Sequence, residues 1–468
     1  MIVEASKHGI QIVFNDIFTQ KTPRALASFV QASLSSSEAD ANASKTNDAP
    51  SEAVGETTPE DAHYAPLNTL LASNTISAFR NGKRQPIGDV LLTGATGYLG
   101  IHILNELLTN YHGRILCPVR AKGNDEALSR IKTLYFYYFG RTEAFSHFDE
   151  RVTAFAAEIT KAPLMSPEGD PIPGFAAEGA AKGGYPLTVI NCVANVKHFS
   201  AGNDIEMVNI ESVRHLITFC LHTGSRLIHI STNSIAGISI DNRPGPEVRL
   251  TEQNFYLGQN VDSNKYVYSK FKAEELVLDA IAHHGLNAKI MRVGNLSARQ
   301  KDGEFQINFN TNNFLAKLRA YVIIGMVPYE DLDQRFEFSP IDEVARAIML
   351  LAQTPQECMV FHPSNTHRQF LSDILMGFAE AGINLKRVEG EVFQQALEKM
   401  MDNPDLVLLL RPLMAYNMST GHSTRWIEST NEHTTQVLYR MGFQWPPTAA
   451  DYVHRFVDTI IGFDYFNV

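Results

Sequence analysis

The sequence predicts an α/β fold in which a doubly wound parallel sheet is followed by a smaller, mostly helical lobe. Short apolar runs alternate with stretches of helical period, and a parallel sheet covered by helices on both faces produces this pattern. A glycine-rich turn follows the first run, and the runs become sparse beyond about residue 300. The predicted strands are Asp89–Thr93, Arg114–Val119, Arg151–Phe155, Leu187–Cys192, Arg226–Ser231 and Asn287–Val293.

Helical periodicity fills the intervals between these strands, most clearly over Leu99–Leu108, Val213–His222 and Ser269–His283. One strand contains Pro118, which has no amide hydrogen to donate to a neighbouring strand. We therefore expect a bulge or an early end of the strand at Pro118.

Composition divides the 468 residues into four segments. Residues 1–32 look ordered, whereas residues 33–64 are rich in Ser, Ala, Thr and acids, with seven acidic residues and one lysine. Such a stretch cannot bury enough apolar surface to fold, so we predict a flexible acidic linker there. Residues 65–300 are assigned to the α/β domain and residues 301–468 to the C-terminal lobe. Short runs within residues 335–362 are candidates to rejoin the sheet.

Charge and cysteine content argue against several classes of protein. The chain has 40 basic and 51 acidic residues, a net charge of −11, which disfavours binding to nucleic acid or to an anionic membrane. No signal peptide and no apolar stretch of transmembrane length is evident. The four cysteines lie in apolar runs without CxxC spacing, and the histidines show no metal-ligand spacing. We therefore expect a cytoplasmic protein without a metal site.

The glycine-rich turn runs from Gly94 to Gly100, between the first strand and the first helix. Glycines at 94, 97 and 100 allow main-chain amides to approach a phosphate at a helix N-terminus, which is typical of dinucleotide binding by a Rossmann-type sheet. The second strand ends at Arg120, and an arginine there suits the 2′-phosphate of NADP. Arg130 is a second candidate for that phosphate. Glu158, with Ile159 beside it, follows the third strand and is a weaker candidate for an adenine contact.

A second cluster of residues suggests carbonyl reduction. Tyr266 and Lys270 are four residues apart in a helical stretch and therefore project from one face. A nearby ammonium group lowers the pKa of a tyrosine, and a hydroxyl at a strand end can hydrogen-bond an oxyanion. Ser231 and Thr232 both supply such a hydroxyl, and we favour Thr232. Tyr268 is only two residues from Lys270 and is expected to be a packing or rim residue.

These motifs together resemble the extended short-chain dehydrogenase/reductase family. The segments RVGNLSARQKDGEFQINFNTNNF and FEFSPIDEVARAI are similar, more narrowly, to the terminal thioester reductase domain of nonribosomal peptide synthetases. The segment GIQIVFNDIFTQKTPRALASFV resembles the end of a peptidyl carrier domain, which makes residues 1–32 a carrier remnant and residues 65–300 an NADP-binding domain. The resemblance implies catalytic Thr232, Tyr266 and Lys270, of which Tyr266 and Lys270 also contact the cofactor. It implies cofactor contacts from Gly94, Thr96, Gly97, Tyr98, Leu99, Gly100, Arg120, Arg130 and Ala194.

The implied reaction is reduction of a peptidyl or aminoacyl thioester by NADPH, with the substrate held on the 4′-phosphopantetheine of the upstream carrier domain. Tyr266 would supply a proton, and the hemithioacetal would collapse to a thiol and an aldehyde, which some relatives reduce further to an alcohol. Three alternatives remain open: an acyl-CoA-type reductase or sugar epimerase acting on a free substrate, a redox-inactive NADP sensor, and a Dieckmann-type cyclase. The presence of both Tyr266 and Lys270 favours reduction over the last two.

Overall fold

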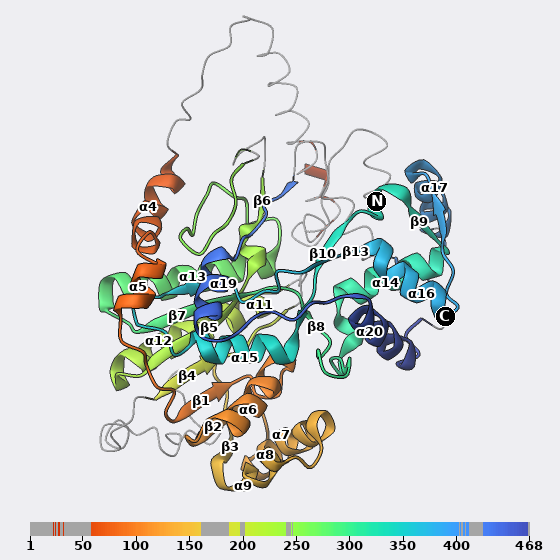
Figure 1. The fold of residues 1–468 in the computed structure, drawn as a ribbon. Coiled ribbons are helices and arrows are strands. Elements are labelled where there is room, and N and C mark those ends of the chain that lie inside the picture. The colour runs from red at the N-terminus through yellow and green to blue at the C-terminus, as the bar shows by residue number, and fades with distance from the viewer. Residues whose placement is uncertain are drawn as a thin grey trace, which may run out of the picture.

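A seven-stranded parallel sheet forms the centre of the protein (Figure 1). This computed structural model describes residues 58–160, 187–196, 202–239, 245, 247–401 and 425–466, and single residues at 22, 24, 27, 28, 31, 403, 406, 407, 409 and 410. The strand order is β12-β7-β5-β4-β1-β2-β3, so the chain winds outward in both directions from β1. The sheet confirms the predicted Rossmann-type α/β fold. Its strands are β1 (Val90–Thr93), β2 (Ile115–Val119), β3 (Val152–Ala156), β4 (Thr188–Asn191), β5 (Arg226–Thr232), β7 (Ala288–Val293) and β12 (Val360–Phe361).

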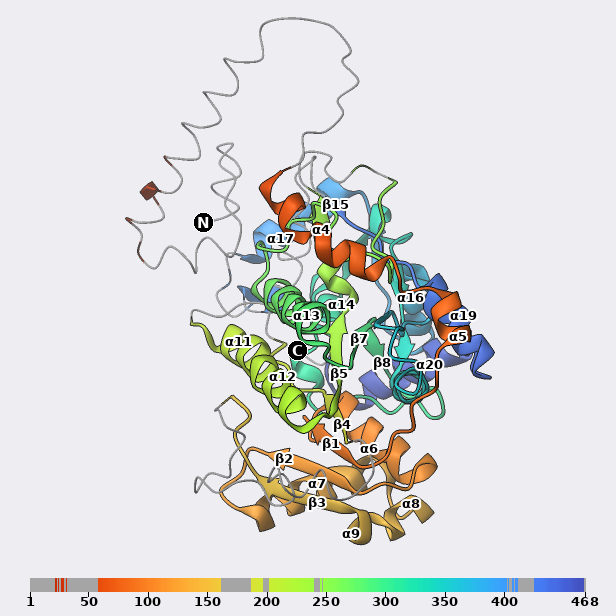
Figure 2. The same ribbon diagram turned by 90° about the vertical axis from the view of Figure 1, so that its left-hand side faces the viewer.

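Helices cover both faces of this sheet (Figures 1 and 2). One apolar core lies between the sheet and α6, α7 and α15, and a second lies between the sheet and α4, α12 and α13. Since both faces of the strands are buried, the strands read as continuous apolar runs. The helices of this domain are α4 (Pro59–Leu71), α5 (Ile76–Asn81), α6 (Tyr98–Asn110), α7 (Asn124–Phe139), α8 (Glu143–Ser146), α9 (Phe148–Arg151), α11 (Asp204–Glu206), α12 (Ser212–Thr223), α13 (Lys265–His284) and α15 (Ile341–Leu351).

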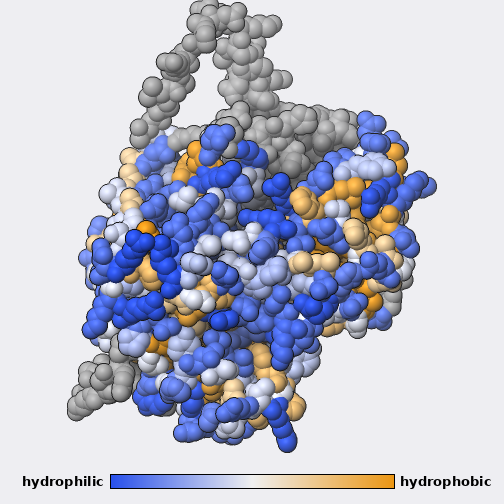
Figure 3. Space-filling model, in the orientation of Figure 1, coloured by the Kyte–Doolittle hydropathy of each residue, from blue (hydrophilic) through white to orange (hydrophobic). Residues whose placement is uncertain are grey.

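The C-terminal lobe has a separate core built from four helices and several short strands. Tyr452, in the last helix of the lobe, connects the lobe to the sheet domain. Its hydroxyl donates to the carbonyl oxygen of Ala298, at the end of the sheet domain, at 2.8 Å. In Figure 3, apolar side chains gather over this lobe, and Met376 is 58 % exposed there. The remaining helices are α14 (Asn313–Ile324), α16 (Leu371–Glu380), α17 (Gly390–Met401), α19 (Glu432–Arg440) and α20 (Ala450–Gly462).

The short strands pair outside the central sheet, with one exception. β12 lies beside β7 in the sheet, but β10 does not rejoin it and pairs antiparallel with β13. Of the two runs considered for the sheet, therefore, only the second lies in it. The short strands are β6 (Ile238–Ser239), β8 (Leu296–Ser297), β9 (Met326–Pro328), β10 (Arg335–Glu337), β11 (Ser339–Pro340), β13 (Arg368–Phe370), β14 (Lys386–Val388) and β15 (Arg425–Trp426).

The predicted linker is shorter than residues 33–64, because α4 already begins at Pro59. Thr58 caps this helix, its main-chain amide donates to the Asp61 carboxylate at 2.9 Å, and Pro59 occupies the first helical position. Two of the seven acids that suggested a linker, Glu60 and Asp61, thus occupy the first turn of a helix, where the helix dipole favours negative charge. The predictions for residues 1–32 fall almost wholly, and those for residues 33–57 entirely, outside the described residues.

The expectation of a bulge or early strand end at Pro118 was wrong. Strand β2 continues through Pro118 to Val119, paired with β3 over its whole length. The paired residues of β1 extend only to Leu116, so Pro118 follows the end of that ladder. A residue beyond the end of a ladder can lack an amide hydrogen without breaking a strand pair.

Candidate active site

The glycine turn between β1 and α6 forms a cradle of main-chain atoms. Gly94 has a φ of +74°, a conformation that side-chain-bearing residues rarely adopt, and its carbonyl oxygen accepts from the amide of Gly97 at 2.8 Å. A Cβ atom on Gly100 would lie 2.1 Å from the same carbonyl oxygen, so only glycine lets α6 start this close to the turn. Gly97 caps α6 without a side-chain hydrogen bond, and the partly buried Thr96 precedes it. The first amides of α6 are therefore available to an anion.

The side chains of the next two residues, Tyr98 and Leu99, are held by the protein itself. Leu99 is buried in the core beneath the sheet. The hydroxyl of Tyr98 donates to the carbonyl oxygens of Ser297 at 3.0 Å and Glu304 at 3.3 Å. Its ring therefore anchors the turn to the segment that leads into the C-terminal lobe, and its burial raises the phenol pKa well above the usual value.

Three of the predicted residues follow the carboxyl ends of β2 and β3, and a fourth, Arg130, reaches the same edge from α7. Arg120 is exposed directly after β2, and Arg130 of α7 donates to its carbonyl oxygen. Among the described residues, nothing hydrogen-bonds or pairs with the Arg120 guanidinium. After β3, Glu158 accepts a hydrogen bond from the Thr160 hydroxyl at 2.9 Å, while Ile159 is buried. The structure thus brings Arg120 and Arg130 together beside the glycine cradle.

Tyr266 and Thr232 meet at the carboxyl end of β5. The side chain of Asn264 caps α13 by accepting from the amide of Tyr266 at 3.0 Å, which fixes where the helix starts. The Thr232 side chain lies close enough to the Tyr266 hydroxyl to lower the pKa of that phenol. Burial raises the pKa of Tyr266 to about 12, and the proximity of Thr232 acts against that rise. The phenol is therefore protonated at neutral pH and can act as a donor.

Lys270 lies one turn along the same face of α13. Its ammonium group donates to the carbonyl oxygen of Ile230 in β5 at 2.6 Å. Burial lowers the pKa of Lys270 to about 8, and the carboxylate of Glu274 opposes that effect.

Thr232 also accepts from the amide of Ser234 at 3.1 Å, which orients its hydroxyl. Ser231 is buried, and its hydroxyl has no hydrogen-bond partner among the described residues, so Thr232 is the hydroxyl that contacts Tyr266.

Ala194 lies in the loop after β4, and this loop is held by a residue that sequence reasoning missed. Asn209, 1 % exposed, accepts from the amide of Asn195 at 2.7 Å and donates to its carbonyl oxygen at 3.0 Å. It also donates to the Ser269 hydroxyl of α13 at 2.9 Å. Asn209 lies in a π-helical turn, η1 (Met207–Glu211), a feature that often marks functional sites. Asn209 therefore ties the Ala194 loop to the helix that carries Tyr266 and Lys270.

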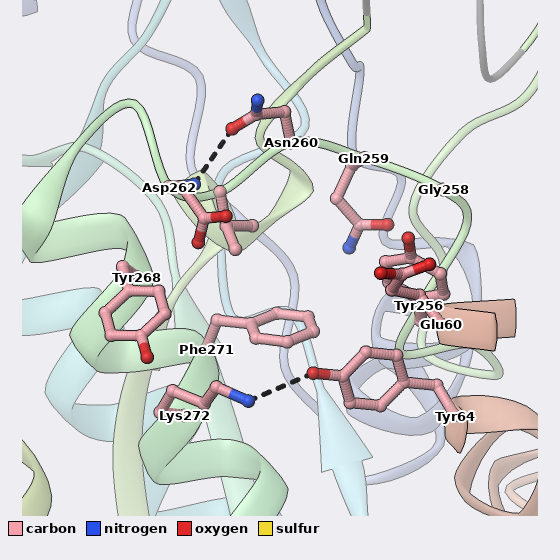
Figure 4. Close-up of a pocket in the computed structure, with 11 residues that line it drawn as sticks. Glu60, Tyr64, Tyr256, Gly258, Gln259, Asn260, Asp262, Tyr268, Phe271 and Lys272 are labelled. Carbon is pink, nitrogen blue, oxygen red and sulfur yellow. Dashed lines mark hydrogen bonds between the residues drawn. The ribbon is translucent and has the colours of Figure 1, made fainter. Parts of the chain in front are cut away.

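A cavity of about 510 Å³ lies on the other side of α13. Figure 4 shows Tyr268 and Lys272 of α13 facing Glu60 and Tyr64 of α4 across it, and Lys272 donates to the Tyr64 hydroxyl at 3.1 Å. Tyr268 therefore lines a rim away from Tyr266. In the described part of the chain, no group of three or more His, Cys, Asp or Glu side chains could hold a metal ion, and no helix could cross a membrane.

Comparison with known proteins identifies the family. A family model described as male sterility protein (NAD_binding_4) matches residues 92–172 and 176–348. A solved thiolation-reductase di-domain from an archaeal nonribosomal peptide synthetase is 31 % identical to this chain and superposes with a TM-score of 0.79. The alignment covers 100 % of this chain and 90 % of the di-domain chain. The chain belongs to the reductase domains of nonribosomal peptide synthetases. As a member of this NAD-binding family, the reductase domain is an oxidoreductase that uses a nicotinamide cofactor.

Curated relatives are much longer than this reductase domain. The isonitrile lipopeptide synthase of Streptomyces coeruleorubidus is 30 % identical over 306 residues, which are 64 % of this chain and 19 % of the relative. The L-2-aminoadipate reductase of Schizosaccharomyces pombe is 24 % identical over 373 residues, 75 % of this chain and 24 % of the relative. The chain spans between 7 % and 22 % of the length of the first three curated relatives.

Proposed function

We propose that this reductase domain releases an acyl or peptidyl thioester from the phosphopantetheine of an upstream carrier domain, using NADPH and forming an aldehyde. The neighbouring hydroxyls of Thr232 and Tyr266, with Lys270 one helical turn away, carry the proposal, because this arrangement polarises a carbonyl rather than cleaving a bond by nucleophilic attack. The carrier domain in the di-domain relative and the reductase activity in the names of other relatives support the choice of substrate.

The residues present fit a nicotinamide dinucleotide. The uncapped amides of α6 and the glycine cradle suit its pyrophosphate, and the exposed guanidinium of Arg120, supported by Arg130, suits a 2′-phosphate. Glu158 and Ile159, which follow β3, would contact the adenine, and Ala194, which follows β4, would lie on the nicotinamide side. When bound, this cofactor supplies the hydride.

The protein's own groups perform the rest of the reduction. Thr232 and Tyr266 donate hydrogen bonds to the thioester oxygen, which becomes negatively charged as hydride reaches the carbon. Tyr266 then transfers its proton to that oxygen, giving a hemithioacetal, and the ammonium of Lys270 stabilises the phenolate that remains. Breaking the C–S bond of the hemithioacetal releases the pantetheine thiol and the aldehyde.

Incubation with an aminoacyl pantetheine thioester and NADPH tests the proposal, with NADPH absorbance and product mass followed together. We expect equimolar NADPH loss and aldehyde, and loss of both in Tyr266→Phe, while the dissociation constant for NADPH stays within about threefold of wild type. A cyclised product formed without NADPH consumption would exclude reduction. Formation of an alcohol with consumption of two equivalents of NADPH would mean that the same site also reduces the aldehyde.

A further inference from the structure

A third ionisable side chain continues the line of Tyr266 and Lys270 on α13. Glu274 follows Lys270 by four residues, so the three side chains project from one face of the helix at successive turns. Glu274 is 0 % exposed and lies between α13 and the sheet. A buried carboxylate is costly to retain unless it is paired, and the reduction described above makes no use of it.

Arg292 of β7 anchors this carboxylate. Its Nε atom donates to Oε2 of Glu274 at 3.0 Å, its Nη2 atom lies 2.9 Å from the same oxygen, and neither side chain is exposed. The arginine is itself held by the carbonyl oxygens of Thr251 at 3.1 Å and Asn254 at 3.0 Å, and it contacts His362, which follows β12, at 3.2 Å. Glu274 is therefore held against Arg292, one helical turn from Lys270.

The other titratable groups that face Lys270 are neutral at neutral pH. Burial, with the Lys270 charge as a lesser cause, depresses the pKa of His229 in β5 well below its usual value. Burial raises the pKa of the Cys192 thiol, in the loop after β4, to about 12. Within the described residues, Glu274 is thus the leading charge that acts on the ammonium group, against a desolvation that favours its neutral form.

We propose that Glu274 is a positioning residue of the reductase: its carboxylate, anchored by Arg292, keeps Lys270 protonated at neutral pH and so keeps the Tyr266–Lys270 pair competent. This inference rests on the proposed function, because it assigns Glu274 to the same proton-donating site. The protonation of Lys270 then depends on the buried Glu274–Arg292 ion pair, which lies one helical turn beyond the residues that contact cofactor or substrate.

The test compares Glu274→Gln with Glu275→Gln. Glu275 is a matched control, since it is the next residue of the same helix but lies on the α4 side of it, where it pairs with Lys272 at 2.7 Å and with His63 at 3.1 Å. Two pH profiles are measured from pH 6 to 9: the dissociation constant for NADPH without thioester, and kcat with a pantetheine thioester. The basic limb of each profile is the pH range over which NADPH affinity or kcat falls as the pH rises. In Glu274→Gln we expect both basic limbs to lie about one to two pH units below those of wild type. One charge at the i,i+4 distance on a helix shifts a pKa by about this amount in a partly screened interior. In Glu275→Gln we expect wild-type profiles.

Glu274→Asp separates charge from packing, because it keeps the carboxylate on a shorter side chain. Its basic limb should stay near that of wild type even if kcat falls. If Glu274→Gln does not fold, Glu274→Gln/Arg292→Gln replaces it, leaves no unpaired buried charge, and should also shift the limb downward. A reduced kcat with an unmoved limb, or an equal shift in Glu275→Gln, would overturn the proposal. If wild type reduces no thioester, the proposed function fails, while the NADPH-binding profiles still decide the role of Glu274.

Discussion

Gly100→Ala probes the glycine cradle, because the structure gives the size of the clash. The new Cβ atom would lie 2.1 Å from the carbonyl oxygen and 2.8 Å from the carbonyl carbon of Gly94, and both are main-chain atoms that no side-chain rotation can move. Alanine gains about 1 kcal/mol over glycine within a helix, but overpacking of this kind costs about 1–3 kcal/mol. The turn must move by roughly 1 Å, as van der Waals packing requires, and its amides then leave the pyrophosphate.

We expect Gly100→Ala to weaken NADPH binding about 10- to 100-fold, measured by fluorescence titration, with a Tm lower by a few degrees. Gly462→Ala is the control, because it is the last residue of α20 and a Cβ atom there meets nothing within 4 Å. It should bind NADPH as wild type does and be equally or slightly more stable. Wild-type affinity and Tm in Gly100→Ala would show that this turn does not hold the pyrophosphate.

The remaining predictions concern cofactor choice, the lobe junction, the nicotinamide-side loop and pH. Arg120→Ala should weaken NADPH binding about tenfold and leave NADH binding unchanged, because only NADPH has the 2′-phosphate that this exposed guanidinium would contact. An equal loss of affinity for NADPH and NADH would refute a 2′-phosphate site at Arg120. Tyr98→Phe should lower the free energy of unfolding by about 1–2 kcal/mol in denaturant titrations, because two main-chain acceptors lose their donor. Asn209→Ala should lower kcat at least tenfold through release of the Ala194 loop, and should lower the Tm by a few degrees because the three hydrogen bonds of a buried side chain are lost. Since Lys270 has a pKa of about 8 and must be protonated, the wild-type kcat should fall as the pH rises through 8; a flat profile to pH 9 would contradict its role.

Local sequence signals predicted the elements that build the site. The six strand runs and the glycine turn could be read because both faces of a parallel sheet are buried and because glycine alone fits the start of α6. The four-residue spacing of Tyr266 and Lys270 needed only the geometry of a helix. Which hydroxyl contacts Tyr266 was less certain, since Ser231 and Thr232 differ only in the strand face from which they project.

Features that depend on contacts distant in the sequence were missed. Asn209 acts through a π-helical turn that no periodicity reveals, and its partners lie 14 and 60 residues away. The pairing of β10 with β13 depends on the packing of the C-terminal lobe rather than on strand propensity. The partnership of Glu274 with Arg292 joins a helix to a strand and appears only once the fold has formed. The start of α4 was hidden because helix-capping acids and linker acids look alike in composition.

Transfer of deuterium from NADPH to product tests the central claim most directly. The enzyme is incubated with an aminoacyl thioester on carrier-bound phosphopantetheine and NADPH that carries deuterium at both hydrogen positions of the nicotinamide C4, and the released product is analysed by mass. The account predicts an aldehyde that carries one deuterium at the former thioester carbon, and no labelled product from Tyr266→Phe. A released product without deuterium, whether acid or cyclised amide, would contradict it.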